Sequence, residues 1–135
     1  MTEIQKESPA GQYSPLALAY LGDAVFSLLA RRHVLAQGNA PADKLHQKGR
    51  SLENAAAQAA MATRLEEMLT GEEQAILRRG RNAKTGSKAK NASLGDYHLA
   101  TGLEALFGYL YLSEREGRLE ELFAICVARE ESQVL

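Results

Sequence analysis

The sequence predicts an all-α fold, and the spacing of its apolar residues is the main reason. Apolar residues recur at helical spacing, as in Leu99, Leu103, Leu106 and Leu110, and no segment shows the strict alternation of a half-buried strand. Residues suited to starting helices also precede the apolar stretches. A chain of 135 residues, 45% of them hydrophobic, is enough for a single domain with one core, and we find no linker or repeat.

The first predicted helix covers residues 15–36. Ser14 suits the N-cap, and Pro15 suits the first helical position because its missing N–H has no partner there anyway. Residues 1–13 before it are expected to form a flexible lead. The segment 15–30 is apolar almost all round, which predicts a helix buried on every side.

The middle of the chain predicts two helical stretches. Pro41 opens the first, and Gly49 is expected to break or bend it. Residues 51–69 are rich in alanine, the best helix former. Thr70 and Glu73 have the spacing of a capping box, which predicts the start of the next helix, over residues 71–82.

The last third of the chain predicts a loop and two more helices. Residues 83–92 contain no apolar anchor, so we expect a loop there. Ser93 with Asp96 can cap a helix that runs to about Glu116, and Gly117 is expected to mark the end of that helix. A final amphipathic helix is then expected over about residues 118–133, which completes the all-α prediction.

The net charge of −1, from 16 Lys and Arg against 17 Asp and Glu, argues at first against a nucleic-acid-binding protein. The average conceals a strongly basic block at residues 74–95, which contains no acid. Such a block suits contacts with phosphates, although a solvated basic loop is the alternative. The candidate RNA-binding residues in it are Arg78, Arg79, Arg81, Lys84, Lys88 and Lys90.

Several classes of protein are excluded by simple features. The only cysteine, Cys126, cannot form an internal disulfide, so a disulfide-stabilised secreted scaffold is excluded. No apolar run reaches the roughly 20 residues that a membrane span needs. The first twelve residues are polar and acidic, unlike a signal peptide, so we expect a cytoplasmic protein that does not enter a membrane.

Asp23 and Glu104 are the most informative residues, because each is the only charge in a long apolar stretch. An unpaired buried carboxylate is unfavourable, and a mid-helix position excludes a capping role. Two carboxylates that converge would suit Mg²⁺, which takes one or two carboxylates together with waters and substrate phosphates. The alternative is that each acid pairs with a basic residue from another helix, and the candidates are Arg31, Arg32, His33 and His98.

Gly22 and Gly108 accompany the two acids. Glycine in a helix interior is less favourable than alanine by about 1 kcal/mol, and a close approach of two helices would justify it. We therefore expect close helix packing beside both acids.

These residues also carry a family resemblance. The segment LALAYLGDAVF at 16–26 resembles the signature helix of ribonuclease III, and GLEALFGYLYL at 102–112 resembles the second acidic motif of that family. The segments RRGRNAK at 78–84 and DYHLATGLEALFGYLYL at 96–112 are similar to its compact branch, Mini-ribonuclease III. Leu45–His46 and Gln58–Ala59 also stand where that branch would place them, and the resemblance covers residues 14–125.

The resemblance implies a homodimeric, all-helical endoribonuclease that cuts double-stranded RNA with Mg²⁺ and leaves 5′-phosphate and 3′-hydroxyl ends. It implies that Asp23 and Glu104 are the catalytic, metal-binding carboxylates, and that the substrate is the precursor of bacterial 23S ribosomal RNA. Two acids of full-length ribonuclease III are replaced, by Ala19 and Thr101, as in the compact branch. Only 23 residues follow Leu112, too few for a double-stranded-RNA-binding domain. The alternative is a catalytically weak or inactive relative that binds RNA or ribosomes.

Overall fold

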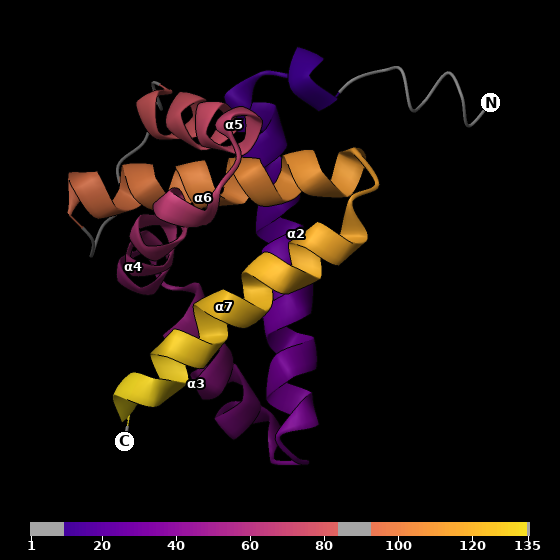
Figure 1. Cartoon of the computed structure of the whole chain (residues 1–135). Coiled ribbons are helices and arrows are strands. Elements are labelled where there is room, and N and C mark those ends of the chain that lie inside the picture. The colour runs from indigo at the N-terminus through magenta and orange to yellow at the C-terminus, as the bar shows by residue number, and fades with distance from the viewer. Residues whose placement is uncertain (1–9, 84–92, 135) are drawn as a thin grey trace.

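The computed structural model describes residues 10–83 and 93–134, and all regular secondary structure in these residues is helical (Figure 1). The predicted all-α class is therefore confirmed. In the described part of the chain, no helix is both long and apolar enough to cross a lipid bilayer. The elements are η1 (Ala10–Gln12), α2 (Pro15–Ala36), α3 (Ala42–Glu53), α4 (Ala55–Leu65), η2 (Glu66–Met68), α5 (Gly71–Asn82), α6 (Leu94–Leu112) and α7 (Glu116–Val134).

Helix α2 begins and ends where the sequence predicts, but only one side of it is buried. The Ala17 amide donates a hydrogen bond of 3.1 Å to the Ser14 hydroxyl oxygen, which caps the helix. On the open side, Tyr20 is 84% exposed and Leu28 is 67% exposed. The expectation of burial on every side is therefore wrong for a single chain, because the other helices cover only one face of α2. The buried face consists of Leu18, Ala19, Gly22, Val25, Phe26, Leu29, Ala30 and Val34.

The inner end of the expected flexible lead is structured. Residues 10–12 form the 3₁₀ helix η1, and Ala10 is only 3% exposed and belongs to the hydrophobic core. Residues 1–9 lie outside the described part of the chain.

The break in the middle of the chain falls at Asn54 and not at Gly49. Asn54 has an extended backbone, with φ −75° and ψ 160°, and its side-chain oxygen accepts a hydrogen bond of 2.8 Å from the Ala57 amide. Asn54 thus ends α3 and caps α4. Gly49 is buried inside α3, where a glycine is tolerated. The alanine-rich helix is also shorter than residues 51–69, because it ends at Leu65.

The predicted capping box at the start of α5 is confirmed. The Glu73 amide donates to the Thr70 hydroxyl at 3.1 Å, and the Thr70 amide donates to the Glu73 carboxylate at 3.0 Å. Helix α5 covers residues 71–82 as predicted. The loop expected over residues 83–92 falls almost wholly on residues 84–92, outside the described part of the chain.

The turn between α6 and α7 differs from the prediction. Ser93 caps α6 as expected, by accepting a 3.0 Å hydrogen bond from the Asp96 amide, but α6 ends at Leu112 and not near residue 116. Glu114 reverses the chain in the left-handed region, at φ 58°. Helix α7 then begins at Glu116, so Gly117 lies inside that helix and does not mark the break between the two helices.

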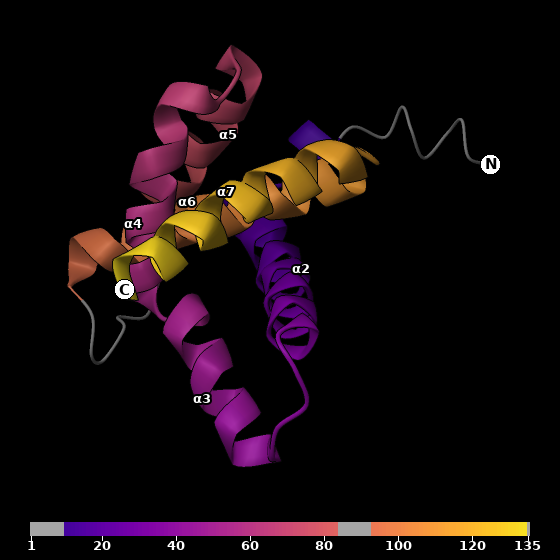
Figure 2. The ribbon, with the colours of Figure 1, turned by 60° about the horizontal axis from the view of Figure 1, so that its bottom comes forward.

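Helix α6 is the centre of the molecule, with α2, α4 and α5 packed around it (Figures 1 and 2). Its residues Leu103, Leu106, Phe107 and Leu110 are completely buried. The Phe26 ring of α2 lies 5.4 Å from the Phe107 ring, a distance typical of paired aromatic side chains. The core therefore fixes α6 relative to its neighbours, and with it every side chain that α6 carries.

A cluster of ion pairs and hydrogen bonds connects the beginnings of α5 and α7 with the end of α6. Arg118 of α7 forms an ion pair of 2.8 Å with Glu73, whose side chain is only 3% exposed. Arg115 pairs with Glu72 at 2.9 Å, and the Tyr109 hydroxyl of α6 donates a hydrogen bond to the same carboxylate. These contacts lower the pKa of both glutamates, chiefly through the hydrogen bonds from Arg118 and Tyr109.

Candidate functional site

Asp23 and Glu104, which are far apart in the sequence, meet where α2 crosses α6. Their side chains lie close enough for a hydrogen bond between the two carboxyl groups. The two helices touch backbone to backbone, since a Cβ atom on Gly22 would lie 1.6 Å from the carbonyl oxygen of Glu104. A Cβ atom on Gly108 would lie 2.1 Å from the carbonyl oxygen of Leu18. The close approach predicted from the two glycines is thus confirmed.

The two carboxyl groups have different surroundings. Asp23 is exposed, whereas Glu104 is partly buried beside the crossing. Burial raises the pKa of Glu104 from 4.5 to about 8, and the nearby Asp23 adds to the rise by its negative charge and by its hydrogen bond. A cation bound next to Glu104 would lower its pKa, because the positive charge favours the ionised form of the carboxyl group.

A second close crossing, between α5 and α6, was not predicted. A Cβ atom on Gly80 would lie 2.9 Å from the Cα atom of Gly102, and a Cβ atom on Gly102 would lie 2.7 Å from the carbonyl oxygen of Leu77. These contacts bring the basic end of α5 against α6 two residues before Glu104. The only sequence signal is the pair of glycines inside two predicted helices.

Two further residues act on Glu104, and sequence reasoning assigned neither of them to the site. The Gln58 side chain of α4 forms a hydrogen bond with Glu104 that partly offsets the rise in its pKa. The negative charge of Glu53, at the end of α3, adds to that rise. Gln58 is the only polar residue in the segment AAAQAAMA, so the signal that singled out the two acids also applies to it.

The chemistry of the two acids fits a divalent cation. Within residues 10–83 and 93–134, no group of three or more His, Cys, Asp or Glu side chains lies close enough to hold a metal ion. A pair of carboxylates still suits Mg²⁺, which takes its other ligands from water and from substrate phosphates. Burial and the negative charge of Asp23 disfavour the ionised form of Glu104, and a bound cation would offset both effects.

The alternative, in which the acids pair with basic residues, finds no support in the described residues. Neither Asp23 nor Glu104 forms an ion pair there, whereas Arg32 pairs with Glu120 of α7 at 2.5 Å. The ring of His98 packs against Tyr97, and its Nδ1 atom is buried without a hydrogen-bond partner. Of the basic candidates, Arg32 and His98 therefore do not neutralise the two acids.

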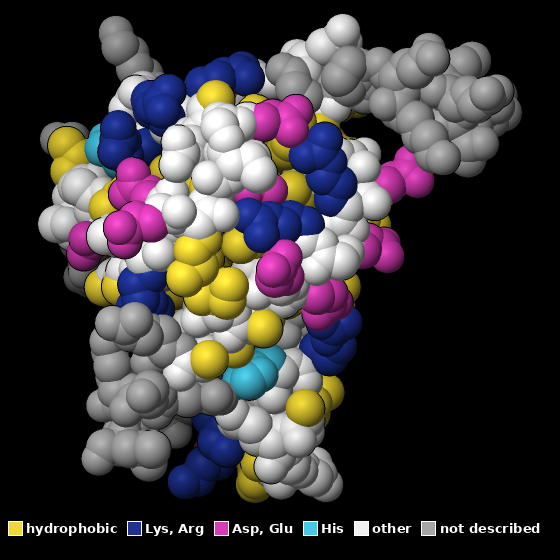
Figure 3. Space-filling view, viewed as in Figure 1, with side chains coloured by type: hydrophobic (Ala, Val, Ile, Leu, Met, Phe, Trp, Pro, Cys, Tyr) yellow, Lys and Arg dark blue, Asp and Glu magenta, His cyan; other side chains and the backbone are white. Residues whose placement is uncertain are grey.

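The structure describes half of the predicted RNA-binding set. Arg78 and Arg79 are exposed near the end of α5, and Arg81 is partly buried. No ion pair involves these arginines in the part of the chain that is described. Dark-blue side chains gather over this corner of the molecule (Figure 3). The remaining candidates, Lys84, Lys88 and Lys90, lie outside the described residues.

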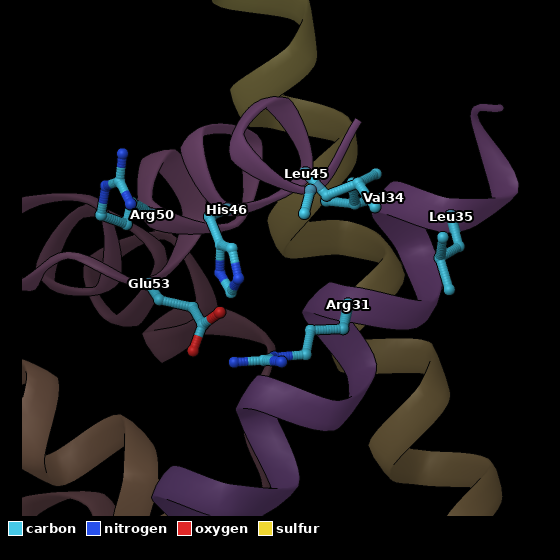
Figure 4. Close-up of a pocket in the computed structure, with 8 residues that line it drawn as sticks. Arg31, Val34, Leu35, Leu45, His46, Arg50 and Glu53 are labelled. Atoms are coloured by element: carbon cyan, nitrogen blue, oxygen red, sulfur yellow. The ribbon is translucent and has the colours of Figure 1, made fainter. Parts of the chain in front are cut away.

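A cavity of about 360 Å³ lies between the second half of α2 and helix α3. Its polar and charged side chains include Arg31, His46 and Glu53, which point toward one another in Figure 4. Val34, Leu35 and Leu45 form its apolar wall. The cavity borders the carboxylate site through Glu53, which acts on Glu104 as described above.

Comparisons with known proteins match this geometry to a family. Residues 16–115 match the model of the Ribonuclease III domain. The chain is similar to Mini-ribonuclease 3 of Brevibacillus brevis, with 47% identity over 81% of each chain. It is also similar to Mini-ribonuclease 3 of Streptococcus pneumoniae, with 42% identity over 86% of this chain and 92% of the relative.

A solved structure has the same fold. The crystal structure of a Fusobacterium nucleatum protein superimposes with a TM-score of 0.80 at 30% identity, over 88% of this chain and 95% of the other. The matched domain includes both acids and the glycines at both helix crossings. The chain therefore belongs to the ribonuclease III family, as an endoribonuclease of its Mini-ribonuclease 3 branch.

Proposed function

We propose that this protein is a Mg²⁺-dependent endoribonuclease that cleaves double-stranded RNA, with Asp23 and Glu104 as its catalytic and metal-binding residues. The observation that carries the proposal is the convergence of these carboxyl groups at the α2–α6 crossing. No basic side chain in the described residues neutralises them. A cation held by both is the partner that their charges and positions favour.

The metal ion and the two acids would have different roles in the hydrolysis of RNA. When bound, Mg²⁺ would supply an activated water and charge stabilisation for the phosphate under attack. Asp23 and Glu104 would hold the cation, and the apolar walls of α2 and α6 around them would strengthen its electrostatic effect. Hydrolysis would leave 5′-phosphate and 3′-hydroxyl ends, as the family resemblance implies.

The basic block would bind the RNA. Double-stranded RNA is recognised mostly by shape, through phosphates and 2′-hydroxyl groups, so exposed arginines and lysines are suitable contacts. Arg78, Arg79 and Arg81 are on the helix that crosses α6 close to Glu104. Lys84, Lys88 and Lys90 follow directly in the sequence and belong to the same proposed surface.

The exposed apolar face of α2 supports a homodimer. Leu16, Tyr20, Leu28 and Leu35 lie exposed along this helix, and Tyr20 is the most exposed, at 84%. An apolar stripe of this kind on a small protein is typical of an interaction surface. A twofold dimer would present two carboxylate sites, one for each strand of the duplex.

The proposed biological substrate is the precursor of 23S ribosomal RNA in the bacterial cytoplasm. This assignment rests on the similarity to the Mini-ribonuclease 3 branch. The catalytic domain would then contact this RNA itself.

The first test separates catalysis from binding. We expect Asp23→Asn and Glu104→Gln each to reduce the cleavage of a short RNA duplex with Mg²⁺ by about a thousandfold or more, since each removes one of two ligand charges. Binding of the duplex in EDTA, measured by fluorescence anisotropy, should stay within about twofold of the unaltered protein.

A matched control shows whether the loss is specific. Glu67→Gln removes an exposed carboxylate on η2, away from the crossing, and should leave cleavage unchanged. Cleavage by Asp23→Asn at a near-normal rate would refute the assignment. No cleavage by the unaltered protein over a wide range of concentrations would favour the inactive RNA-binding alternative.

A further inference from the structure

Gln58 is an unusual side chain in this fold. Only three polar or charged residues are buried in the described part of the chain: Gln58, at 3% exposure, Glu73 and Thr101. The last two are satisfied within the scaffold, because Glu73 binds Arg118 and the Thr101 hydroxyl donates to the Tyr97 carbonyl at 2.9 Å. The partner of Gln58 is instead Glu104, a residue of the carboxylate site.

Gln58 is held on a rigid base. It lies on the first turn of α4, where its backbone amide donates to the Asn54 carbonyl at 3.0 Å. The following residues Ala59, Met61 and Ala62 are buried, and α4 packs closely against α6. This packing places the amide group of Gln58 beside Glu104 in the interior of the fold.

The chemistry of this contact points to orientation of the acid. The side-chain amide of glutamine has two N–H donors, and a carboxylate accepts hydrogen bonds only. An amide donor beside the Glu104 carboxylate restricts its rotation, and Asp23 is a second hydrogen-bond partner of the same group. A buried glutamine would otherwise be unfavourable in a segment made almost entirely of alanine, where an apolar residue fills the space without needing a partner.

We propose that Gln58 is a positioning residue of the metal site, whose side-chain amide holds the Glu104 carboxylate in the orientation that receives a divalent cation together with Asp23. This inference rests on the proposed function of the two acids. Partners that hydrogen-bond to ligating carboxylates commonly contribute about 10- to 100-fold to metal affinity or activity. Gln58 would act through Glu104 and would not itself touch the cation.

The test measures cation binding directly. In Gln58→Leu and Gln58→Met the amide donor is removed while most of the volume is kept. We expect the affinity for Mn²⁺, measured by electron paramagnetic resonance on the RNA-free protein, to fall by about 10- to 100-fold. The Mg²⁺ concentration for half-maximal cleavage should rise by a similar factor, with most of kcat regained at saturating Mg²⁺. Duplex binding in EDTA should not change.

The matched control is Met61→Leu, which alters a completely buried residue one turn further along the same helix. Its Mn²⁺ affinity should stay within about twofold of the unaltered protein, because it only repacks the core. Folded Gln58→Leu and Gln58→Met proteins that bind Mn²⁺ as tightly as the unaltered protein would overturn the proposal.

A second measurement needs no metal and separates the two proposals. If the unaltered protein binds no divalent cation, the proposed function fails, and the role of Gln58 can still be tested on the metal-free protein by carbon-13 NMR titration of Glu104. Removal of the amide donor should move this titration to higher pH than in the unaltered protein, because the donor favours the ionised carboxylate. An unchanged midpoint in both Gln58 variants would show that the amide does not hold Glu104.

Discussion

At the scale of the residue, a lone polar side chain in an apolar helix is the most useful signal in this sequence. It led to Asp23 and Glu104, and the structure brings both to one crossing. The same signal marks Gln58, whose role depends on a contact between α4 and α6. Sequence spacing carries no information about that distance, which explains why the acids could be predicted and their partner could not.

The pKa of Glu104 gives a prediction for the metal-free protein. Its value of about 8 in the fold exceeds the ordinary 4.5, so between these values the folded protein binds more protons than the unfolded chain. Stability should therefore fall as pH rises from about 4.5 to 8 and then level off. Glu104→Gln removes this loss, so in EDTA at pH 9 it should be more stable than the unaltered protein by up to about 5 kcal/mol, since one pKa unit corresponds to about 1.4 kcal/mol.

Thermal unfolding in EDTA across this pH range provides the measurement. The two proteins should unfold at similar temperatures near pH 4.5, where Glu104 is protonated, and should diverge above it. Glu67→Gln is the control, since it makes the same substitution on η2 and leaves the α2–α6 crossing intact. Equal stability of Glu104→Gln and the unaltered protein at pH 9 would contradict the conclusion that burial and the charge of Asp23 raise the pKa of Glu104.

At the scale of the element, side-chain caps predicted the helix boundaries better than glycines did. Ser14 and the pair Thr70–Glu73 start helices as expected, because each supplies an acceptor for an amide that has no partner in its helix. Gly49 and Gly117 lie inside helices, where glycine is unfavourable by only about 1 kcal/mol and packing outweighs it. Sequence cannot report that balance, since it depends on tertiary contacts.

The exposed end of α5 gives a prediction for RNA binding. Replacing Arg78 and Arg79 together by glutamine should weaken duplex binding and flatten its salt dependence by about 0.7–0.9 log units for each phosphate that the protein no longer neutralises. Anisotropy titrations at several salt concentrations measure this slope. Arg115→Gln is the control, because Glu72 already neutralises that charge, and it should leave the slope unchanged. An unchanged slope in the double variant would place the RNA on another face.

At the scale of the whole molecule, α2 has two unlike faces. One is packed against α6 and carries Gly22, and the other exposes Leu16, Tyr20 and Leu28. The proposed dimer would explain why the sequence of this helix is apolar all round, since one face packs in the core and the other would contact the partner copy. Composition alone cannot distinguish burial by the same chain from burial by another copy.

The proposed dimer can be tested through Tyr20. The unaltered protein should have twice the chain mass of 14.7 kDa in analytical ultracentrifugation. Tyr20→Glu should weaken association by about tenfold or more, since a charge would be buried in an apolar contact. Met68→Glu alters another exposed apolar residue, on η2, and should leave the mass unchanged. A monomeric unaltered protein, or a Tyr20→Glu protein that associates as tightly, would refute the dimer.

The backbone contact at Gly22 and Gly108 has a consequence for redesigning the protein. Because the two main chains already touch, the spacing of the helices cannot be reduced, and any larger side chain at either glycine must push them apart. Within the proposed cation site, the distance between the ligands can therefore be changed only through the lengths of the side chains at positions 23 and 104. The crossing fixes the distance between the two main chains, and only the side chains that it carries can be exchanged.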